Sequence, residues 1–565
     1  MNDLLNEARA WLADDPDPAT RSELAALIEE ADQGDASALA ELGDRFSGFL
    51  VFGTAGLRGA LAAGPNRMNR SVVIRAAAGL AGYLDAMREP VHGDRHRVVI
   101  GYDARHGSHT FAMDSAAVMI GAGIEALVLP RALPTPVLAF AVRKLNADAG
   151  IMVTASHNPP RDNGYKVYLG GRDSGSQIIA PSDAEIASHI HDVDSTARIR
   201  RAAEGWREIG DDLIDAYIAS AAALADQSEQ RRNVRMVHTS LHGVGGTTVV
   251  AALSRAGFDD VHPVPEQAAP DPDFPTVAFP NPEEPGAMDL ALALAAQIDA
   301  DIVLANDPDA DRLAVALPER KSTPAGPRWR MLHGDELGAL LGLRLARKAC
   351  DEAPGTFVNT VVSSRLLGRI ACAHGIPHVE TLTGFKWISR VPGLAFGYEE
   401  ALGYCVDPAS VRDKDGISAA VLLAELAADT LAAGSTLWEV LDELARAHGL
   451  HATDQLSVRA DDLELITDAM RRLRLDPPEE LGGAKVIIRD DFRDAASGLP
   501  PTDGLRYFTA DDSRVIVRPS GTEPKLKCYL ETVVDVIDDD VEAARTIASA
   551  RLTALRGDLV RMLGV

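Results

Sequence analysis

The segment TASHNPPRDNGYKVY contains the first side chain that could do covalent chemistry, the hydroxyl of Ser156. An apolar run ending at Val153 precedes it, and the His, Asn, Pro and Gly residues around it favour a loop at the carboxyl end of a strand, where open α/β sheets bind ligands. Serine is a weak nucleophile, so it needs a base, a metal or an attached phosphoryl group. His157 follows directly, but the G-x-S-x-G elbow of hydrolases is absent, and the segment alone is more typical of a turn.

The segment NDPDADR predicts a binding site for a hard cation. Asp307, Asp309 and Asp311 alternate directly after the apolar run DIVLA, and this spacing in an extended loop points the side chains one way. Carboxylate oxygens suit Mg²⁺, which usually keeps a phosphate oxygen among its ligands. An EF-hand calcium loop is excluded, because its sixth position needs Gly and is Arg312, and its twelfth needs Glu and is Pro318. A solvated acidic turn is the alternative, but the adjacent arginine suits a phosphate and favours the metal site.

A third segment, AFGYEEALGY, has carboxylates suited to a sugar. Glu399 and Glu400 lie between glycines after a strand-like run, where they could accept hydrogen bonds from vicinal sugar hydroxyls. Upstream, the segment LTGFKW adds Thr383, Gly384 and Lys386 as further polar contacts. Both segments could be ordinary surface loops, and neither is specific alone.

A fourth segment, RPSGTEPKLK, has the composition of a phosphate-binding loop. Arg518 supplies a guanidinium, Ser520 and Thr522 supply hydroxyls, and Gly521 allows backbone amides to approach an anion closely. A plain tight turn explains the segment equally well until the other three are considered with it.

The elements that must position these loops read as several α/β domains. From Val51 short apolar runs alternate with helical stretches, and this pattern restarts near VRMVHTSLHGVGG and again near HGDELGALLGLRLARKA. We therefore predict three consecutive mixed or parallel α/β domains and a smaller C-terminal α+β domain. The predicted ranges are a helical extension over residues 1–50, which we expect to brace the first domain, and domains over 51–215, 216–330, 331–455 and 456–565.

Bulk properties limit the classes of partner. A chain of 565 residues exceeds what one hydrophobic core usually serves, and its formal charge of -27 repels nucleic acid and anionic membrane surfaces. The four cysteines show no C-x-x-C spacing, and the N-terminus lacks the pattern of a signal peptide. We therefore expect a cytoplasmic protein, a monomer or homodimer, that binds a small molecule and neither nucleic acid nor membrane.

Taken together, the four segments resemble the α-D-phosphohexomutase superfamily, the phosphoglucomutases and phosphomannomutases. Its phosphoserine, metal, sugar and phosphate loops occur in this order, one per domain, and the resemblance extends from about Phe52 to Glu531. It includes FGTAGLRG, in which Arg58 matches an active-site arginine of the family. The resemblance implies a heart-shaped, four-domain enzyme of carbohydrate metabolism.

The resemblance also assigns roles to the residues. Ser156 would be the phosphoserine and, with Asp307, Asp309 and Asp311, would bind one Mg²⁺. Phosphorylated Ser156 would donate to a sugar monophosphate, and the resulting bisphosphate would turn around and return its other phosphate, interchanging 1-phosphate and 6-phosphate (or 5-phosphate). A sugar bisphosphate would thus be both intermediate and activator. The residues around the transferring group would be Arg58, Lys166 and Arg312, with Lys166 as the acid or base if neighbouring cations lower its pKa and His157 as the weaker candidate. The substrate would contact Thr383, Gly384, Lys386, Glu399, Arg518, Ser520, Gly521 and Thr522.

The sugar loop departs from the common family pattern. Many hexomutases have G-E-x-S-G, whereas this chain has EEALG, with Ala401 in place of the serine and Tyr404 in place of a histidine frequent in bacterial relatives. The helical extension and EEALGY are closer to the phosphoglucomutase-2 and phosphopentomutase-like branch. We rank glucose phosphate first as substrate, mannose phosphate second, and ribose or deoxyribose phosphate third.

Two other classes of protein remain as alternatives. A metal-dependent phosphatase would use Asp307 as its nucleophile, but DPDAD lacks the Thr or Val that follows in the haloacid-dehalogenase pattern. A non-catalytic sugar-phosphate binding protein would be expected to have lost the serine or the aspartate triplet, and both are present.

Overall fold

The computed structural model describes residues 2–50, 56–226, 233–320, 328–349, 355–459, 463–494, 498–520 and 525–563. The chain forms two compact units. Unit 1 comprises Met1–Met331 and Gly403–Glu425, and unit 2 comprises Leu332–Leu402 and Leu426–Val565. Each unit is described by itself.

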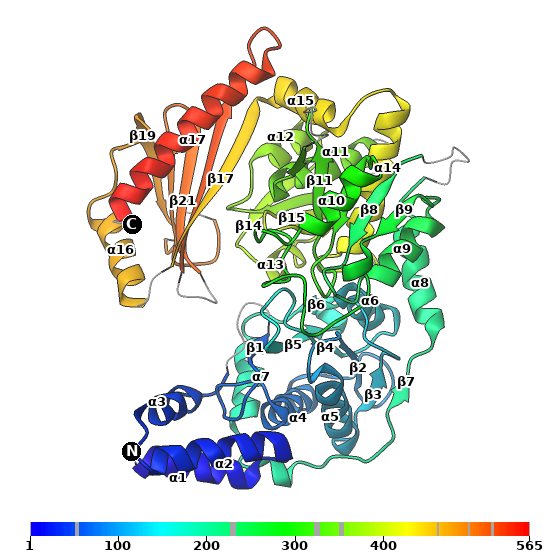
Figure 1. The fold of residues 1–565 in the computed structure, drawn as a ribbon, viewed down its shortest axis with the longest axis vertical. Coiled ribbons are helices and arrows are strands. Elements are labelled where there is room, and N and C mark those ends of the chain that lie inside the picture. Colours follow the sequence, from blue (N-terminus) through cyan, green and yellow to red (C-terminus); the bar gives the residue numbers. More distant parts are fainter. Residues whose placement is uncertain are drawn as a thin grey trace. The chain divides into compact units, whose positions relative to one another are not determined.

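Three helices open unit 1, namely α1 (Asn2–Asp14), α2 (Pro18–Asp32) and α3 (Ala36–Arg45). Asp17 and Asp35 cap the second and third, each accepting a hydrogen bond from a backbone amide in the first turn. Their apolar faces, including Trp11 and Leu24, are buried in the same core as residues of α4 (Arg70–Met87) and α7 (Ser182–His191) of the first domain. Figure 1 shows the three helices next to this domain. The extension is therefore built into this domain.

The first domain is a sheet in the order β1-β5-β4-β2-β3-β7, with β6 paired to β5. Strands β2, β3 and β4 are parallel and almost wholly buried, as their continuous apolar runs predict, whereas β1 and β5 pair antiparallel at one side. The elements are β1 (Leu57–Ala60), α4 (Arg70–Met87), β2 (Arg97–Tyr102), α5 (Ser108–Gly121), β3 (Glu125–Val128), α6 (Thr135–Lys144), β4 (Ala149–Val153), β5 (Asp162–Leu169), β6 (Ser176–Gln177), α7 (Ser182–His191), β7 (Arg207–Glu208) and α8 (Asp211–Ala222).

The second domain, also in unit 1, is a mixed sheet in the order β12-β11-β10-β8-β9. Strands β8, β9 and β10 are parallel, and β11 and β12 continue the sheet antiparallel. The elements are β8 (Met236–Thr239), α9 (Gly246–Arg255), β9 (Val261–Pro263), α10 (Asp289–Gln297), β10 (Ile302–Ala305), β11 (Ala314–Pro318) and β12 (Trp329–Met331).

The chain comes back to unit 1 through Gly403–Glu425, here called the returning segment. It contains β16 (Gly403–Cys405) and the first turns of α14 (Gly416–Ala432). Asp413 accepts hydrogen bonds from Tyr168 and Gln177 of the first domain, at 2.8 and 2.7 Å. Asp415 accepts one from Tyr217 at 2.8 Å and also caps α14. These buried contacts make the returning segment part of the packing of unit 1.

Unit 2 contains a parallel sheet in the order β14-β13-β15 and an antiparallel sheet in the order β17-β22-β21-β20-β19-β18. Helices α16 and α17 bury apolar side chains against the second of these sheets. Figure 1 shows α17 lying across this sheet. The elements are α11 (Gly334–Lys348), β13 (Thr356–Thr360), α12 (Leu366–Ala373), β14 (His378–Thr381), α13 (Phe385–Ile388), β15 (Leu394–Glu399), α15 (Leu437–His448), β17 (Leu450–Arg459), α16 (Leu463–Leu475), β18 (Glu480–Leu481), β19 (Ala484–Asp491), β20 (Leu505–Thr509), β21 (Ser513–Pro519), β22 (Lys525–Val534) and α17 (Val541–Leu563).

Among the described residues, no single helix is long and apolar enough to cross a membrane. Helices α14 and α15 satisfy the length and hydropathy criteria only as a pair, and this pair is bent by 91°.

Candidate active site

Ser156 lies just beyond the carboxyl end of β4, in a left-handed backbone conformation with φ of 51°. Such a conformation is uncommon for a residue with a Cβ and is found mainly where the surrounding structure enforces it. Thr154 Oγ1 accepts a hydrogen bond from the Ser156 amide at 2.9 Å. Arg105 donates from its guanidinium to the carbonyl oxygens of Ser156 and Asn158 at 2.7 and 2.6 Å. Thr154 and Arg105 thus fix the backbone of the loop. The buried Ser156 hydroxyl donates to Asp307 Oδ2 at 2.6 Å.

The three aspartates follow β10 and are fully buried, and one oxygen from each lies within 4.8 Å of the others. Asp309 Oδ1 and Asp311 Oδ1 are buried and lack a hydrogen-bond partner. Burying three carboxylates together is costly unless positive charge is supplied, and oxygen donors suit a hard divalent cation. The residues therefore fit a metal site.

Positive side chains surround the triplet. Lys166 Nζ, from β5, lies 2.7 Å from Asp309 Oδ2 and 2.9 Å from Asp311 Oδ2, and Lys414 Nζ, from the returning segment, lies 3.3 Å from Asp311 Oδ2. Burial lowers the pKa of Lys166, but Asp309 and Asp311 outweigh this, so its pKa is raised overall. The acid or base role predicted for Lys166 required neighbouring cations to lower its pKa, whereas the two aspartates raise it. The structure instead places a protonated lysine here.

His157 Nδ1 lies 3.3 Å from Ser156 Oγ and 3.8 Å from Asp307 Oδ2. Burial, reinforced by Arg312 and Arg58, holds the pKa of His157 well below its ordinary value of 6.5. A neutral imidazole at this distance can accept the proton of a hydroxyl.

Two arginines complete the first-unit site. Strand β1 pairs with β5 so that Arg58 is opposite Gly164, and no side chain at residue 164 could fit because a Cβ would lie 2.5 Å from the Thr154 carbonyl oxygen. Burial lowers the pKa of Arg58, while Asp309 opposes that shift. Arg312 Nε lies 3.8 Å from Asp311 Oδ1. Unit 1 thus gathers Ser156, His157, Lys166, Arg58, Arg312 and the three aspartates, all predicted from the sequence.

Three residues of this site were not predicted: Arg105, Thr135 and Lys414. Arg105 shapes the serine loop through carbonyl oxygens, and Thr135 Oγ1 donates to Asp309 Oδ2 at 2.6 Å. Lys414 lies in the run RDKDG, whose charged residues directly before a long helix were the available signal. None carries a motif that reveals its partner, because each partner is distant in sequence.

Unit 2 contains the remaining predicted residues that the structure describes. Thr383 and Gly384 precede α13, where Gly384 has φ of 107°, and Lys386 lies in that helix. Glu399 ends β15, and the neighbouring Glu400 accepts hydrogen bonds from Thr360 and Ser363, each at 3.0 Å. Arg518 lies in β21 and Ser520 directly after it, while Gly521 and Thr522 lie outside the described residues.

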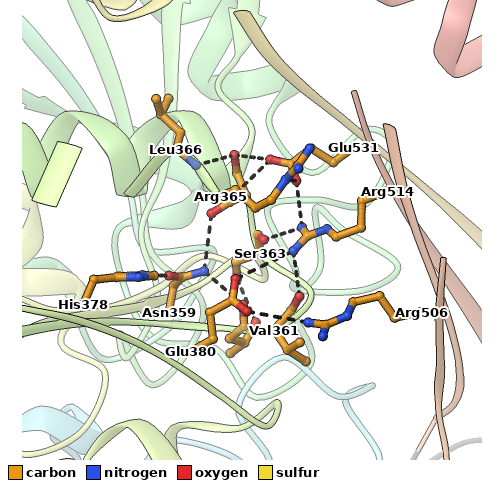
Figure 2. Close-up of polar contacts among 12 residues, drawn as sticks. Asn359, Val361, Ser363, Arg365, Leu366, His378, Glu380, Arg506, Arg514 and Glu531 are labelled. Carbon is orange, nitrogen blue, oxygen red and sulfur yellow. Dashed lines mark hydrogen bonds and ion pairs between the residues drawn. The ribbon is translucent and has the colours of Figure 1, made fainter. Parts of the chain in front are cut away.

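A buried ionic network joins the two sheets of unit 2 (Figure 2). Glu531 of β22 accepts from Ser364 Oγ at 2.8 Å and Arg365 Nε at 2.7 Å, and Arg514 of β21 lies 3.1 Å from it. Arg514 also donates to the carbonyl oxygen of Ser363 at 2.6 Å. Because the Ser363 hydroxyl binds Glu400, the network connects the strand before the predicted phosphate loop with the predicted sugar loop.

Asp335, at the start of α11, gives unit 2 a measurable pH dependence. Burial raises its pKa from 3.8 to about 7, although Ser364 N and Tyr398 OH donate to Oδ1 at 2.6 and 2.9 Å. Between these pH values the folded chain binds a proton that the unfolded chain does not, so this group's contribution to stability falls as pH rises from 4 to 7.

An asparagine at residue 335 cannot ionise, so the stability of Asp335→Asn relative to the wild type should rise by roughly 3–4 kcal/mol between pH 4 and 7 and level off above pH 7. Thermal unfolding of both proteins across this range tests the prediction. Parallel curves for the two proteins would contradict it.

Comparison with known proteins identifies the family. The four phosphoglucomutase/phosphomannomutase domain families, three α/β/α domains and a C-terminal domain, match residues 50–197, 215–320, 333–447 and 470–546. "Probable phosphomannomutase" of Haemophilus influenzae is 45% identical over 82% of this chain and 93% of its own. Human phosphopentomutase is 36% identical over 97% of this chain and 94% of its own. A phosphoglucomutase/phosphomannomutase family protein of Burkholderia thailandensis has the same fold, with a TM-score of 0.66 at 20% identity over 91% of this chain and 97% of its own. The chain therefore belongs to the phosphoglucomutase/phosphomannomutase family of phosphosugar mutases.

Proposed function

We propose that this mutase transfers the phosphoryl group through Ser156, interconverting the 1-phosphate and 6-phosphate of a hexose. The observation that carries the proposal is the buried Ser156 hydroxyl, held 2.6 Å from a carboxylate of the aspartate triplet. In the first half-reaction the bond from phosphorus to Ser156 Oγ breaks and a bond to the free sugar hydroxyl forms. The proton of that hydroxyl leaves, and Oγ regains a proton. The bisphosphate then returns its other phosphoryl group to Oγ by the reverse exchange.

The residues of unit 1 suit the charge changes in this exchange. Asp307, Asp309 and Asp311, with Ser156, would hold Mg²⁺, which supplies positive charge to the transferring phosphoryl group when bound. Arg58 and Arg312 add fixed positive charge, which phosphoryl transfer needs more than covalent assistance. His157 is neutral and can accept a hydroxyl proton, whereas Lys166 is protonated and can donate one.

The proposed substrate contacts of unit 2 would bind the rest of the sugar phosphate. Glu399, Thr383, Gly384 and Lys386 supply groups for the sugar. The distal phosphate would be bound by Arg518, Ser520, Gly521 and Thr522, and the same anchor would serve both orientations of the bisphosphate.

A pentose phosphate is the second candidate substrate. Human phosphopentomutase aligns with 97% of this chain, whereas the phosphomannomutase relative aligns with 82% of it. We propose glucose and mannose phosphates as the first substrates and ribose 1-phosphate or 5-phosphate as the second. Discrimination between glucose and mannose phosphates depends on hydrogen-bond geometry at one hydroxyl.

The test is to label the purified wild-type protein with glucose 1,6-bisphosphate carrying ³²P and to locate the phosphopeptide by mass spectrometry. We expect label on Ser156 that is chased off by glucose 1-phosphate, mannose 1-phosphate or ribose 1-phosphate in the order of their kcat/KM. Label on Asp307, or steady release of inorganic phosphate without isomerisation, would establish the phosphatase instead. Faster chase by the pentose phosphate would reverse the ranking of substrates.

A further inference from the structure

Thr135 is a fully buried residue at the first position of α6 in the first domain. Its backbone amide donates to the carbonyl oxygen of Asp309 at 2.9 Å, and its hydroxyl donates to Asp309 Oδ2 at 2.6 Å. Both groups of one threonine therefore bind one aspartate of the neighbouring domain, and both residues belong to unit 1.

The two oxygens of Asp309 differ in their surroundings. Oδ2 accepts from the Thr135 hydroxyl and from Lys166 Nζ, at 2.6 and 2.7 Å, whereas Oδ1 is buried without a hydrogen-bond partner. Asp311 differs, since Oδ2 faces Lys166 and Lys414 while Oδ1 has no hydrogen-bond partner but lies 3.8 Å from Arg312 Nε. In Asp309 the protein binds one oxygen and leaves the other for a cation.

Asp309 Oδ1 and Oδ2 keep these different surroundings only if the carboxylate does not rotate. A carboxylate rotates readily about its Cβ–Cγ bond, because that torsion has broad minima. Lys166 alone does not fix the rotation of Asp309, because its ammonium also binds Asp311 and its donors are spread around a flexible stem. The Thr135 hydroxyl is short, rigidly attached and anchored by its own backbone amide, so it defines a single orientation.

We propose that Thr135 is a positioning residue that holds the Asp309 carboxylate with Oδ1 directed at the cation, and so sets the affinity of the metal site. The proposal rests on the proposed function, since it takes the triplet as the metal site. Groups that orient metal ligands in this way typically change metal affinity about 10–100-fold when removed. The two hydrogen bonds from Thr135 to Asp309 also join the start of α6 to the loop that contains the aspartate triplet.

The test compares Thr135→Val, which keeps the shape and loses the hydroxyl, with Thr135→Ser, which keeps the hydroxyl. Binding of Mn²⁺ is followed by electron paramagnetic resonance of the free ion, without sugar phosphate, and Mg²⁺ is measured by competition. We expect the valine variant to bind Mn²⁺ about 10–100-fold more weakly and the serine variant within about threefold of wild type. At saturating metal the kcat of the valine variant should recover most of its loss.

A matched control separates positioning from general loss of packing. Thr430→Val also removes a buried threonine hydroxyl, one that donates to the Leu426 carbonyl within α14 at 2.7 Å, and should leave Mn²⁺ affinity unchanged. Thr135→Ala, with the same expected weakening, replaces the valine variant if the latter does not fold. If Thr135→Val or Thr135→Ala bound Mn²⁺ as tightly as the wild type, or if Thr135→Ser bound it as weakly as the valine variant, the role of Thr135 would be overturned and the proposed function would stand. Absence of Mn²⁺ and Mg²⁺ binding by the wild type would overturn the proposed function as well.

Discussion

Ser156→Ala is expected to lower mutase turnover by at least ~10³-fold and to abolish transfer of labelled phosphate from a sugar bisphosphate to the protein. Oγ is the only atom of Ser156 that alanine lacks, and it is the atom that faces Asp307. The backbone should not respond, because alanine has the same cost at φ of 51° as serine. A coupled assay of glucose 6-phosphate formation gives turnover, and intact mass gives the covalent phosphate.

Ser176→Ala is the control for this experiment. Ser176 is buried in β6 of the same domain, and its hydroxyl has no hydrogen-bond partner, so removing it should leave both turnover and labelling unchanged. Turnover of Ser156→Ala within tenfold of the wild type, with the control intact, would rule out a relay through Ser156.

Glu531→Gln is expected to destabilise unit 2 by about 3–5 kcal/mol, because it removes the fully buried carboxylate that Arg365 and Arg514 share and leaves them only the more exposed Asp512 and Glu380. Burial opposes ionisation of Glu531, but Arg514, His451 and Arg365 outweigh it and hold the pKa of Glu531 well below 4.5. Glutamine has a similar shape and cannot compensate two guanidinium groups. Native-state hydrogen exchange of amides in β21 and β22 measures the opening free energy of this region directly.

Asp512→Asn provides the comparison for an exposed pair. Asp512 Oδ1 accepts from the same Arg365 at 2.6 Å, but its side chain is 50% exposed, so its loss should cost less than about 1 kcal/mol. Asparagine also tolerates the positive φ of residue 512, which removes backbone strain as an explanation. Equal effects of the two substitutions would show that burial does not set the strength of the Glu531 network.

The sequence predicted those parts of the site whose partners are close along the chain. Asp307, Asp309 and Asp311 are alternate residues after one apolar strand, so a local pattern was enough to group them. The same holds for the class of the domains, because buried parallel strands are continuous apolar runs. Ser156 could be linked to these aspartates only through the family resemblance, since 151 positions separate it from its partner.

The remainder depends on packing between distant elements. The threonine in LPTP has no local feature that indicates a carboxylate 174 positions away. The pKa of Lys166 rises because Asp309 and Asp311 outweigh the effect of burial. That balance depends on the distances from Lys166 Nζ to the two carboxylates, which only the fold determines. The Glu531 network likewise combines residues from β13–α12, β17, β21 and β22, none of which forms a motif.

The returning segment delays the completion of unit 1 during synthesis of the chain. Unit 1 is complete only when Gly403–Glu425 is available, although most of it precedes Leu332. During synthesis at ~5–20 residues per second, the partners of Asp413 and Asp415, made 198 to 245 residues earlier, would wait about 10–50 seconds. Over that interval Tyr168, Gln177 and Tyr217 lack their buried acceptors, and this part of the nascent chain is exposed to chaperones and proteases. A fragment ending at Met331 would remain in that condition permanently.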